Sequence, residues 1–235
     1  MVEHHNLVKV LAEFAHTLTG GYEITDVLYR LADSVVDVLG ATGAGVSLAD
    51  AGRLRAVTAI NTLSAAIEAA EQEYQQGPCV DAYRDGRSVI ASNLAEWATS
   101  WPDYTTVARR HGVVSVLAVP VAARDSTMGT LNVYSVESRS WSDDATVAQT
   151  FADMAASYLL HASELDRAQR TAEQLQRALD SSRVIEQAKG VLANEYNIPV
   201  ETAFDILRRH ARGHNANLAS TAEAIVHLGL RPPRR

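Results

Sequence analysis

Residues 181–196, SSRVIEQAKGVLANEY, form the stretch from which the rest of the chain can be interpreted. Its packing residues recur at steps of three and four: Ile185, Ala188, Leu192 and Tyr196. This spacing predicts a helix with one packed face and a charged face that is free to bind. Gly190 lies in mid-helix, where glycine costs about 1 kcal/mol relative to alanine, so we expect a second backbone or a nucleic acid to come close there. The alternative is a packed helix with ordinary solvated charges.

The charge of the chain is distributed unevenly along its length. The 235 residues carry a net charge of −7. Residues 1–180 hold 13 basic and 23 acidic groups, a net of −10, whereas residues 181–235 hold 8 basic and 5 acidic groups, a net of +3. The segment after residue 180 is therefore the part of the chain suited to approach phosphate groups.

The cysteine content and the motifs exclude several classes of protein. Cys79 is the only cysteine, which rules out an internal disulfide and a metal site built from several cysteines. There is no apolar run of about eighteen residues, and the N-terminal MVEHHNLVKVLAEFA is charged and amphipathic, unlike a signal peptide. We therefore expect a cytoplasmic protein with no membrane partner. Because metal-ligand spacings, Gly-rich phosphate loops and paired acid motifs are missing from the sequence, we predict no enzyme, no metal and no cofactor.

The first 150 residues alternate between helical and extended patterns. Helical spacing predicts helices near 7–18, 25–39, 64–74 and 102–111, and extended patterns predict strands at 43–48, 54–60, 114–121 and 128–134. Asp50-Ala51-Gly52 and the polar turn Arg124-Asp125-Ser126-Thr127 join the strands in pairs. This order predicts an α+β fold, with helices against one face of a mostly antiparallel sheet and the other face available for a pocket.

The long helix that follows is predicted from the lack of breakers, since glycine and proline are missing from Thr130 to Lys189. Its repeat by three and four consists of Phe151, Met154, Tyr158, His161, Leu165, Ala168, Ala172, Leu175, Leu179 and Ser182. This heptad seam predicts a coiled coil and a parallel homodimer. The alternative is a helix that lies on the N-terminal sheet.

The tail of the chain predicts two more helices, from Pro199 to Gly213 and from Leu218 to Leu228. With the stretch at 181–196 they would form a minimal three-helix bundle, which coupling to the coil would stabilise. RPPRR at 231–235 is interpreted as a frayed basic end.

Two parts of the chain resemble known families. SRVIEQAKGVLANEYNI (182–198) and AFDILRRHARGHNANLASTAEAIV (203–226) closely resemble the ANTAR domain, a three-helix RNA-binding module of bacterial antitermination regulators. GPCVDAYRDGRSVI (77–90), WPDYTTVARRHGV (101–113), VLAVPV (116–121) and GTLNVYS (129–135) resemble a GAF domain of the kind joined to ANTAR in actinobacterial regulators. The resemblance implies a GAF-like sensor domain with an N-terminal helix at 1–150, a coiled-coil dimerisation helix at 151–180 and an ANTAR-like domain at 181–235.

The ANTAR resemblance implies a function and a set of RNA-binding residues. Related proteins act as dimers that bind paired RNA hairpins with small loops in a nascent transcript and prevent a terminator from forming. Exposed loop bases suit this role, because the major groove of an RNA stem is closed to side chains. The matching positions are Arg183, Lys189, Gly190, Arg208, Arg209, Arg212 and Asn215. For the arginines the alternative is a solvated charge, and for Asn215 it is a structural role in the turn before the last helix.

The GAF resemblance implies a sensor whose input is an unknown small molecule or an upstream signalling protein. Candidates for a pocket are Cys79, Tyr83, Trp97, Trp101, Tyr104 and His111. The alternative for each is an ordinary packing role, since cysteine is among the most buried residue types.

Two other functions are weighed against RNA binding. A protein-interaction or scaffold module is favoured by the lack of basic residues at 216 and 217. DNA binding through a helix-turn-helix fits less well, because the last predicted helix carries no basic residue except His227.

Overall fold

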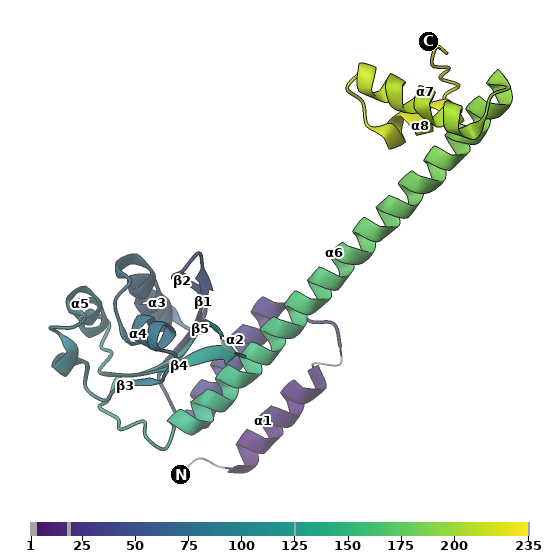
Figure 1. Ribbon diagram of the computed structural model, residues 1–235. Coiled ribbons are helices and arrows are strands. Elements are labelled where there is room, and N and C mark those ends of the chain that lie inside the picture. Colours follow the sequence, from purple (N-terminus) through teal and green to yellow (C-terminus); the bar gives the residue numbers. More distant parts are fainter. Residues whose placement is uncertain (1–3, 18–19, 125, 235) are drawn as a thin grey trace. The chain divides into compact units, whose positions relative to one another are not determined.

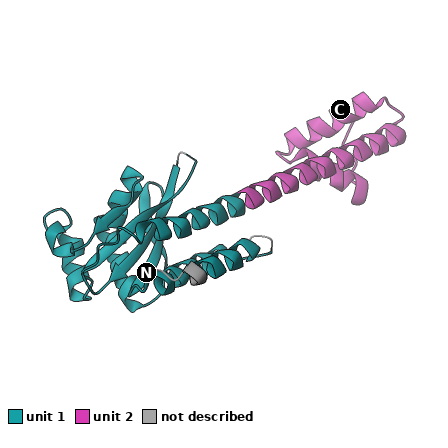
Figure 2. Ribbon diagram, turned by 90° about the horizontal axis from the view of Figure 1, so that it is seen from below, with its two compact units in different colours: residues 1–163 teal, residues 164–235 magenta. Residues whose placement is uncertain are grey.

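The computed structural model describes residues 4–17, 20–124 and 126–234, so the predicted positions Leu18 and Asp125 lie outside it. The chain forms two compact units, which are residues 1–163 (unit 1) and 164–235 (unit 2), coloured separately in Figure 2. One helix, α6 (Ala145–Tyr196), contributes residues to both units.

Unit 1 is built on a five-stranded sheet with the strand order β2-β1-β5-β4-β3. The strands are β1 (Gly43–Asp50), β2 (Arg53–Ala59), β3 (Val89–Ala91), β4 (Ser115–Ala123) and β5 (Ser126–Ser135). All four neighbouring pairs are antiparallel, as the sequence predicts. The β1–β2 hairpin turns at Ala51 and Gly52, whose φ angles of 49° and 80° give the left-handed backbone that tight hairpin turns require.

Helices cover both faces of this sheet, so the prediction of one helical face and one open face is wrong (Figure 1). On one face lie α1 (His4–Thr17), α2 (Ile24–Leu39) and the start of α6, with a core that includes Leu28, Leu31 and Phe151. On the other lie α3 (Thr62–Tyr74), α4 (Pro78–Asp85) and α5 (Pro102–Arg110). Residues 115–121 of β4 are buried without alternation, which is the pattern of a strand covered on both sides.

Three short elements between α3 and α5 have no counterpart in the sequence prediction: α4, β3 and the 3-10 helix η1 (Leu94–Trp97). Helix α4 begins with Pro78 at its first position and ends before Gly86, whose φ of 63° is left-handed. These are common start and stop residues of a helix. The segment is only eight residues long, so its helical periodicity is too short to recognise.

The predicted heptad seam of α6 divides into two parts. Phe151 and Tyr158 are buried in the core of unit 1, where the Tyr158 hydroxyl donates to the Phe14 carbonyl oxygen. Their positions correct the expectation that the whole seam faces a partner chain, because α1 and α2 already cover them. Leu165, Leu175 and Leu179 are 56%, 61% and 65% exposed.

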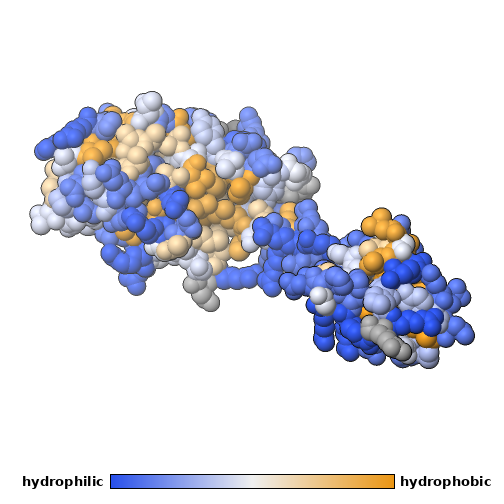
Figure 3. Space-filling view, turned by 90° about the horizontal axis from the view of Figure 1, so that it is seen from above, coloured by the Kyte–Doolittle hydropathy of each residue, from blue (hydrophilic) through white to orange (hydrophobic). Residues whose placement is uncertain are grey.

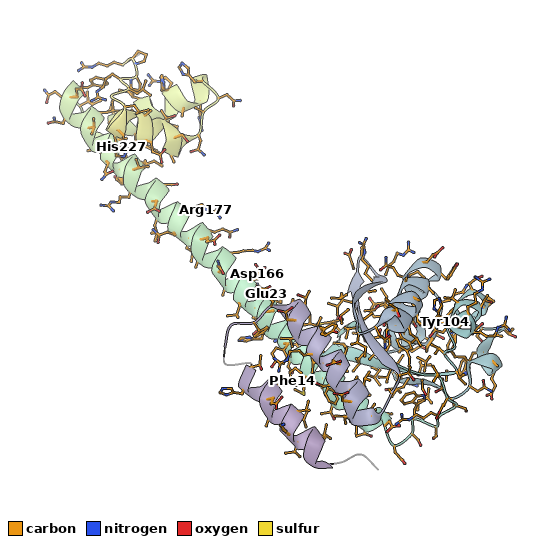
Figure 4. All side chains as sticks on the ribbon, turned by 180° about the vertical axis from the view of Figure 1, so that it is seen from behind. Phe14, Glu23, Tyr104, Asp166, Arg177 and His227 are labelled. Atoms are coloured by element: carbon orange, nitrogen blue, oxygen red, sulfur yellow. The ribbon has the colours of Figure 1, made fainter. Side chains whose placement is uncertain are left out.

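The middle of α6 is predominantly hydrophilic, and its few apolar side chains are exposed (Figure 3). Asp166 and Arg177, labelled in Figure 4, point away from the helix. The exposed part of the seam, Leu165 to Leu179, is therefore the only apolar feature of this segment that remains for another chain to cover.

Unit 2 contains a three-helix bundle made by the end of α6 with α7 (Val200–Gly213) and α8 (Leu218–His227), as predicted. Its buried residues are Val184, Ala188, Leu192, Ala203, Ile206, Leu207, Ala222 and Ile225. Asn217 caps α8, because its side-chain oxygen accepts hydrogen bonds from the backbone N–H groups of Ala219 at 2.8 Å and Ser220 at 3.4 Å.

Candidate nucleic-acid interface and sensor site

Lys189, a predicted RNA-binding residue, is paired within its own helix. Its Nζ lies 2.8 Å and 2.9 Å from the two carboxylate oxygens of Glu186. The ammonium lies 5.5 Å from the centre of the Phe204 ring on α7, and the side chain is 18% exposed. Glu186 therefore compensates the charge of Lys189. Because Glu186 is itself exposed, replacing it by another anion beside Lys189 would cost less than about 1 kcal/mol.

Arg208 on α7 is compensated in the same way. Its Nη2 lies 3.1 Å from Oδ1 of Asp205, one turn earlier on the helix. Its guanidinium carbon is 5.9 Å from the centre of the Phe204 ring. Arg208 and Lys189 thus both lie near Phe204, and each is paired with an acidic residue of its own helix, Asp205 and Glu186 respectively.

Arg209 and Arg212 are the cations of α7 that keep their charge available. Both are exposed, and neither forms an ion pair with any described residue. Because they are three residues apart on one helix, they lie on the same side of α7. They are therefore the two predicted residues best placed to meet a phosphate backbone together.

Arg183 lies in a different environment. It lines a groove of about 560 Å³ between α6 and α8, together with Asp180, Glu223 and His227. Two acidic side chains in the same lining reduce the positive potential there. Arg183 therefore lies in a less positive environment than Arg209 and Arg212, which have no acidic partner among the described residues.

The C-terminal tail is docked on the bundle, so its interpretation as a frayed end is wrong for residues 231–234. The Tyr196 hydroxyl donates to the Pro232 carbonyl oxygen at 2.8 Å, and Pro232 is buried. Arg234 donates to the Tyr196 carbonyl oxygen at 2.7 Å and lies 4.7 Å from the centre of that ring. Two features of the sequence could have indicated this docking: the aromatic Tyr196 at the end of a helix and Pro232 near the end of the chain.

The docked tail brings a further cation beside α7. Arg209 Nη1 donates to the Arg234 carbonyl oxygen at 3.5 Å, whereas Arg231 pairs with Glu195. Arg234 has no acidic partner among residues 4–17, 20–124 and 126–234. Sequence reasoning missed Arg234, whose backbone lies beside Arg209.

Gly190 is exposed, and a side chain added there would meet no other atom of the chain within 4 Å. The packing of the bundle therefore does not require glycine at this position. The approach of another molecule at Gly190, expected from the sequence, stays a prediction.

Asn215 adopts a left-handed conformation with a φ of 50°, which asparagine tolerates better than most residues. Its side chain is exposed, and α8 is capped by Asn217. Asn215 is thus free to contact a ligand, but its presence in the turn also has a purely structural reason.

The sensor candidates divide by burial. Cys79, Trp101 and Tyr104 are buried, Tyr83 and Trp97 are half-buried, and His111 is exposed at the end of α5. The Trp101 Nε1 donates to Asp81 Oδ2 at 3.1 Å, and the Trp97 and Trp101 rings stack at 4.4 Å. His111 therefore lies outside the buried set to which Cys79 and Tyr104 belong.

Two buried glutamates of α3, which the sequence analysis missed, lie beside these residues. Glu68 and Glu71 are each 1% exposed. Glu68 accepts hydrogen bonds from Ser47 Oγ at 2.6 Å, Asn132 Nδ2 at 2.9 Å and the Tyr134 hydroxyl at 2.8 Å. Gly45 makes room for this carboxylate, since a side chain there would begin 2.2 Å from Glu68 Oε1.

Glu71 lies in the same buried cluster as Glu68. Its Oε2 accepts a long hydrogen bond of 3.4 Å from Asn132 Nδ2, and the Cys79 thiol and the Tyr104 hydroxyl are hydrogen-bonding neighbours of its carboxylate. Asn132 Oδ1 is buried and has no hydrogen-bond partner in the described part of the chain. Buried polar atoms without partners are uncommon and often mark a functional site.

Burial dominates the electrostatics of this cluster. It raises the pKa of Glu68, although the three hydrogen bonds act in the opposite direction. Burial, and after it the charge of Glu68, raise the pKa of Glu71 well above its usual range. The same burial, with the charges of Glu71 and Glu68, raises the pKa of the Cys79 thiol well above its usual value, which makes the thiol a weak nucleophile.

The described residues hold no group of three or more histidine, cysteine or acidic side chains that could bind a metal ion. Within the same residues, no helix is both long enough and apolar enough to cross a membrane.

Comparisons with solved structures identify the fold of unit 1. The chain is similar to the GAF domain of a phosphoenolpyruvate-protein phosphotransferase from Acinetobacter (17% identity, TM-score 0.54, 68% of this chain and 97% of that one). It is also similar to a GAF domain from Coxiella burnetii (13% identity, TM-score 0.54, 70% of this chain and 99% of that one). A third similar structure is a free methionine-R-sulfoxide reductase from Neisseria meningitidis (16% identity, TM-score 0.51, 68% of this chain and 91% of that one). At these identities the likeness establishes the fold alone. No curated protein matches the chain.

Family comparisons cover both units. Residues 23–159, more than half of the chain, match the GAF domain, and residues 173–226 match the ANTAR domain. The second match includes α7 with Arg209 and Arg212 and begins in α6 before Gly190. The chain therefore belongs to the GAF domain family, and it joins a GAF sensor domain to an ANTAR domain, the RNA-binding module of antitermination regulators.

Proposed function

We propose that this protein is a cytoplasmic, non-enzymatic regulator that binds paired RNA hairpins as a parallel homodimer and prevents transcription termination in response to a signal. The GAF domain receives the signal, the exposed part of the seam from Leu165 to Leu179 dimerises, and residues 181–235 bind RNA. The observation that carries the proposal is the ANTAR match over 173–226 together with the exposed, unpaired arginines of α7. Positive side chains that have no acidic partner can bind the phosphates of an RNA backbone.

The exposed seam of α6 supports the homodimer. Leu165, Leu175 and Leu179 are each more than half exposed, in a middle segment of α6 that is otherwise predominantly hydrophilic. Burying a leucine contributes about 1.5–3 kcal/mol, so pairing two copies would stabilise the helix where unit 1 does not cover it. The dimer would then hold two RNA-binding bundles, and a second linked hairpin would bind at a raised effective concentration.

Specific RNA binding can be tested by fluorescence anisotropy with a labelled tandem hairpin at 100 mM salt. We expect the double variant Arg209→Ala/Arg212→Ala to bind more weakly and to lower the slope of log K against log salt by about one per arginine. Arg170→Ala is the control, because Arg170 is exposed on α6 but precedes the ANTAR match. No binding by the wild type, or equal effects of the α7 variant and the control, would contradict the proposal.

One observation favours a second candidate function, a protein-interaction module. Lys189 and Arg208 are both neutralised by acidic neighbours, as a scaffold with incidental basic residues would allow. If the bundle docks a protein, the tandem hairpin should fail to bind at 100 mM salt. The failure should persist in the Glu186→Gln and Asp205→Asn variants, which release both cations.

A further inference from the structure

A cavity of about 360 Å³ lies between η1 and α5 of the GAF domain. Its lining comes from η1 and the residues beside it, from one face of α5, and from Val113 and Val114 just before β4. None of the six sensor candidates expected from the sequence belongs to this lining, and neither does Glu68 or Glu71. Helix α5 lies at the periphery of unit 1 (Figure 1), so the cavity is distinct from the buried cluster and can be reached from solvent.

The most buried part of the lining is aliphatic. Leu94 and Val113 are 4% and 3% exposed, and the hydroxyl of Thr105 is already used, because it donates to the Trp101 carbonyl oxygen at 2.8 Å. Ligand pockets have volumes of about 300–1,000 Å³ and are lined mainly by apolar side chains with a few polar groups. The volume of this cavity lies at the lower end of that range, so the cavity suits a small ligand with an aliphatic part.

Two polar side chains of the lining can donate to a ligand. Arg109 is the one charged residue of the lining, and it forms no ion pair within residues 4–17, 20–124 and 126–234. Asn93 Oδ1 accepts a hydrogen bond from the backbone N–H of Ala95 at 3.1 Å, which leaves the Nδ2 group of Asn93 without a partner among the same residues. A guanidinium binds a carboxylate through two parallel N–H bonds, so the donors of this cavity match that anion.

We propose that the GAF domain binds a small aliphatic monocarboxylate in this cavity, with the carboxylate at Arg109 and the hydrocarbon part against Leu94 and Val113. The inference rests on the proposed sensory role of this domain and names the class of ligand that it senses. A phosphate monoester matches the cavity less well. It carries a charge of about −1.5 to −2 and three strong acceptor oxygens, which exceed what one guanidinium and one amide can satisfy.

The wall of the cavity is connected to α4 through two tryptophans. Trp97 and Trp101 directly precede the lining residues Ala98 and Pro102, and their rings stack with their centres 4.4 Å apart. Trp101 Nε1 also donates to Asp81 Oδ2 on α4 at 3.1 Å. A ligand that changes the spacing of η1 and α5 would therefore change the stacking of the two indoles.

Three probes test the inference on the full chain in the absence of RNA. The first, 4-methylpentanoate, has both the carboxylate and an aliphatic part. The second, 4-methylpentan-1-amine, has the same hydrocarbon with the opposite charge, and the third, acetate, has the carboxylate without the longer hydrocarbon. The readouts are tryptophan fluorescence, which reports on the stacked indoles, and the midpoint of thermal unfolding.

We expect 4-methylpentanoate to change the fluorescence in a saturable way. At concentrations well above its dissociation constant it should raise the midpoint of unfolding by about 3 °C or more. The amine and acetate should have no effect at the same concentrations. Equal responses to all three probes, or no response to 4-methylpentanoate, would overturn the inference.

Variants of two adjacent arginines show whether the carboxylate binds in this cavity. Arg109→Gln should weaken 4-methylpentanoate binding at least about tenfold, and Arg109→Lys, which keeps the charge and loses the planar fork, should weaken it less. Arg110→Gln is the matched control, because Arg110 is exposed and does not belong to the lining. Wild-type affinity in Arg109→Gln, or an equal loss in Arg110→Gln, would overturn the inference.

The RNA assay keeps this inference apart from the proposed function. Hairpin binding by a chain that does not respond to 4-methylpentanoate would overturn the inference alone. A response to 4-methylpentanoate without hairpin binding would support the inference and refute the proposed RNA-binding function.

Discussion

Replacing Glu71 by glutamine should remove the main source of an unusual pH dependence in the stability of the GAF domain. The pKa of Glu71 in the folded chain is raised well above its usual value of 4.5 by burial and by the charge of Glu68. The folded state therefore binds a proton that the unfolded state has already released. Stability from this group is complete below about pH 4.5 and is lost as the pH rises through the folded pKa.

The magnitude follows from the single proton involved. One proton of difference between the folded and unfolded states changes the free energy of unfolding by about 1.4 kcal/mol per pH unit. The wild type should lose stability at up to about this rate above pH 4.5. Glu68, whose pKa is also raised, acts in the same direction. The Glu71→Gln variant lacks the contribution of Glu71 to this loss. Its free energy of unfolding should therefore rise relative to that of the wild type as the pH rises.

The assay is urea denaturation between pH 5 and pH 8, followed by tryptophan fluorescence. Trp97, Trp101 and Trp141 are the three tryptophans of the chain and all lie in unit 1, so the signal reports on the GAF domain. Glu73→Gln is the matched control, because it makes the same chemical change at an exposed position of α3. Identical pH slopes for the wild type and Glu71→Gln would show that Glu71 does not cause the pH dependence, as would a variant that loses stability relative to the wild type as the pH rises.

Three further predictions concern unit 2 and the seam. Gly190→Ala should stabilise the bundle by up to about 1 kcal/mol in thermal unfolding by circular dichroism and yet weaken hairpin binding; unchanged binding would mean that RNA does not approach there. Tyr196→Phe removes the hydrogen bond to Pro232, which contributes about 0.5–1.5 kcal/mol, and should speed hydrogen exchange in residues 228–234; unchanged exchange would contradict the docked tail. Leu165→Glu/Leu175→Glu should convert the dimer to a monomer in light scattering, with unit 1 still folded by tryptophan fluorescence; a variant that stays dimeric would exclude this seam as the interface.

The fold could be predicted in outline because most elements are long and periodic. Helix α2 and the β1–β2 hairpin lie within one or two residues of their expected limits. The coverage of the sheet was misjudged although the signal was present, since Val116 to Val121 is an unbroken apolar run of the kind found in strands buried on both faces. Helix α4 and strand β3 were missed because eight and three residues are too few to show a period.

The seam of α6 shows why periodicity does not identify a partner. Phe151 and Leu175 follow the same heptad, yet the first is buried in the core of unit 1 and the second is 61% exposed. The spacing of apolar residues predicts which face of a helix is covered. The spacing does not show whether the residues that pack on that face belong to the same chain or to another one.

The site residues were harder to predict than the elements that hold them. Lys189 and Arg208 were chosen by their charge, but the sequence does not show that Glu186 and Asp205 neutralise them. Glu68 and Glu71 were overlooked because glutamate on a helix is usually solvated, and only the three-dimensional structure brings them against Asn132 and Tyr104. Arg234 was dismissed with the chain end, although Pro232 and Tyr196 fix its position.

We propose that a dimer of this protein holds two ANTAR bundles, which bind two linked hairpins together. The most direct test compares the affinity of the wild-type protein for a tandem hairpin and for each hairpin alone, at 100 mM salt. We expect the tandem RNA to bind at least about tenfold more tightly than either hairpin alone, because the second hairpin binds at a raised effective concentration. Equal affinity for single and tandem hairpins would contradict it.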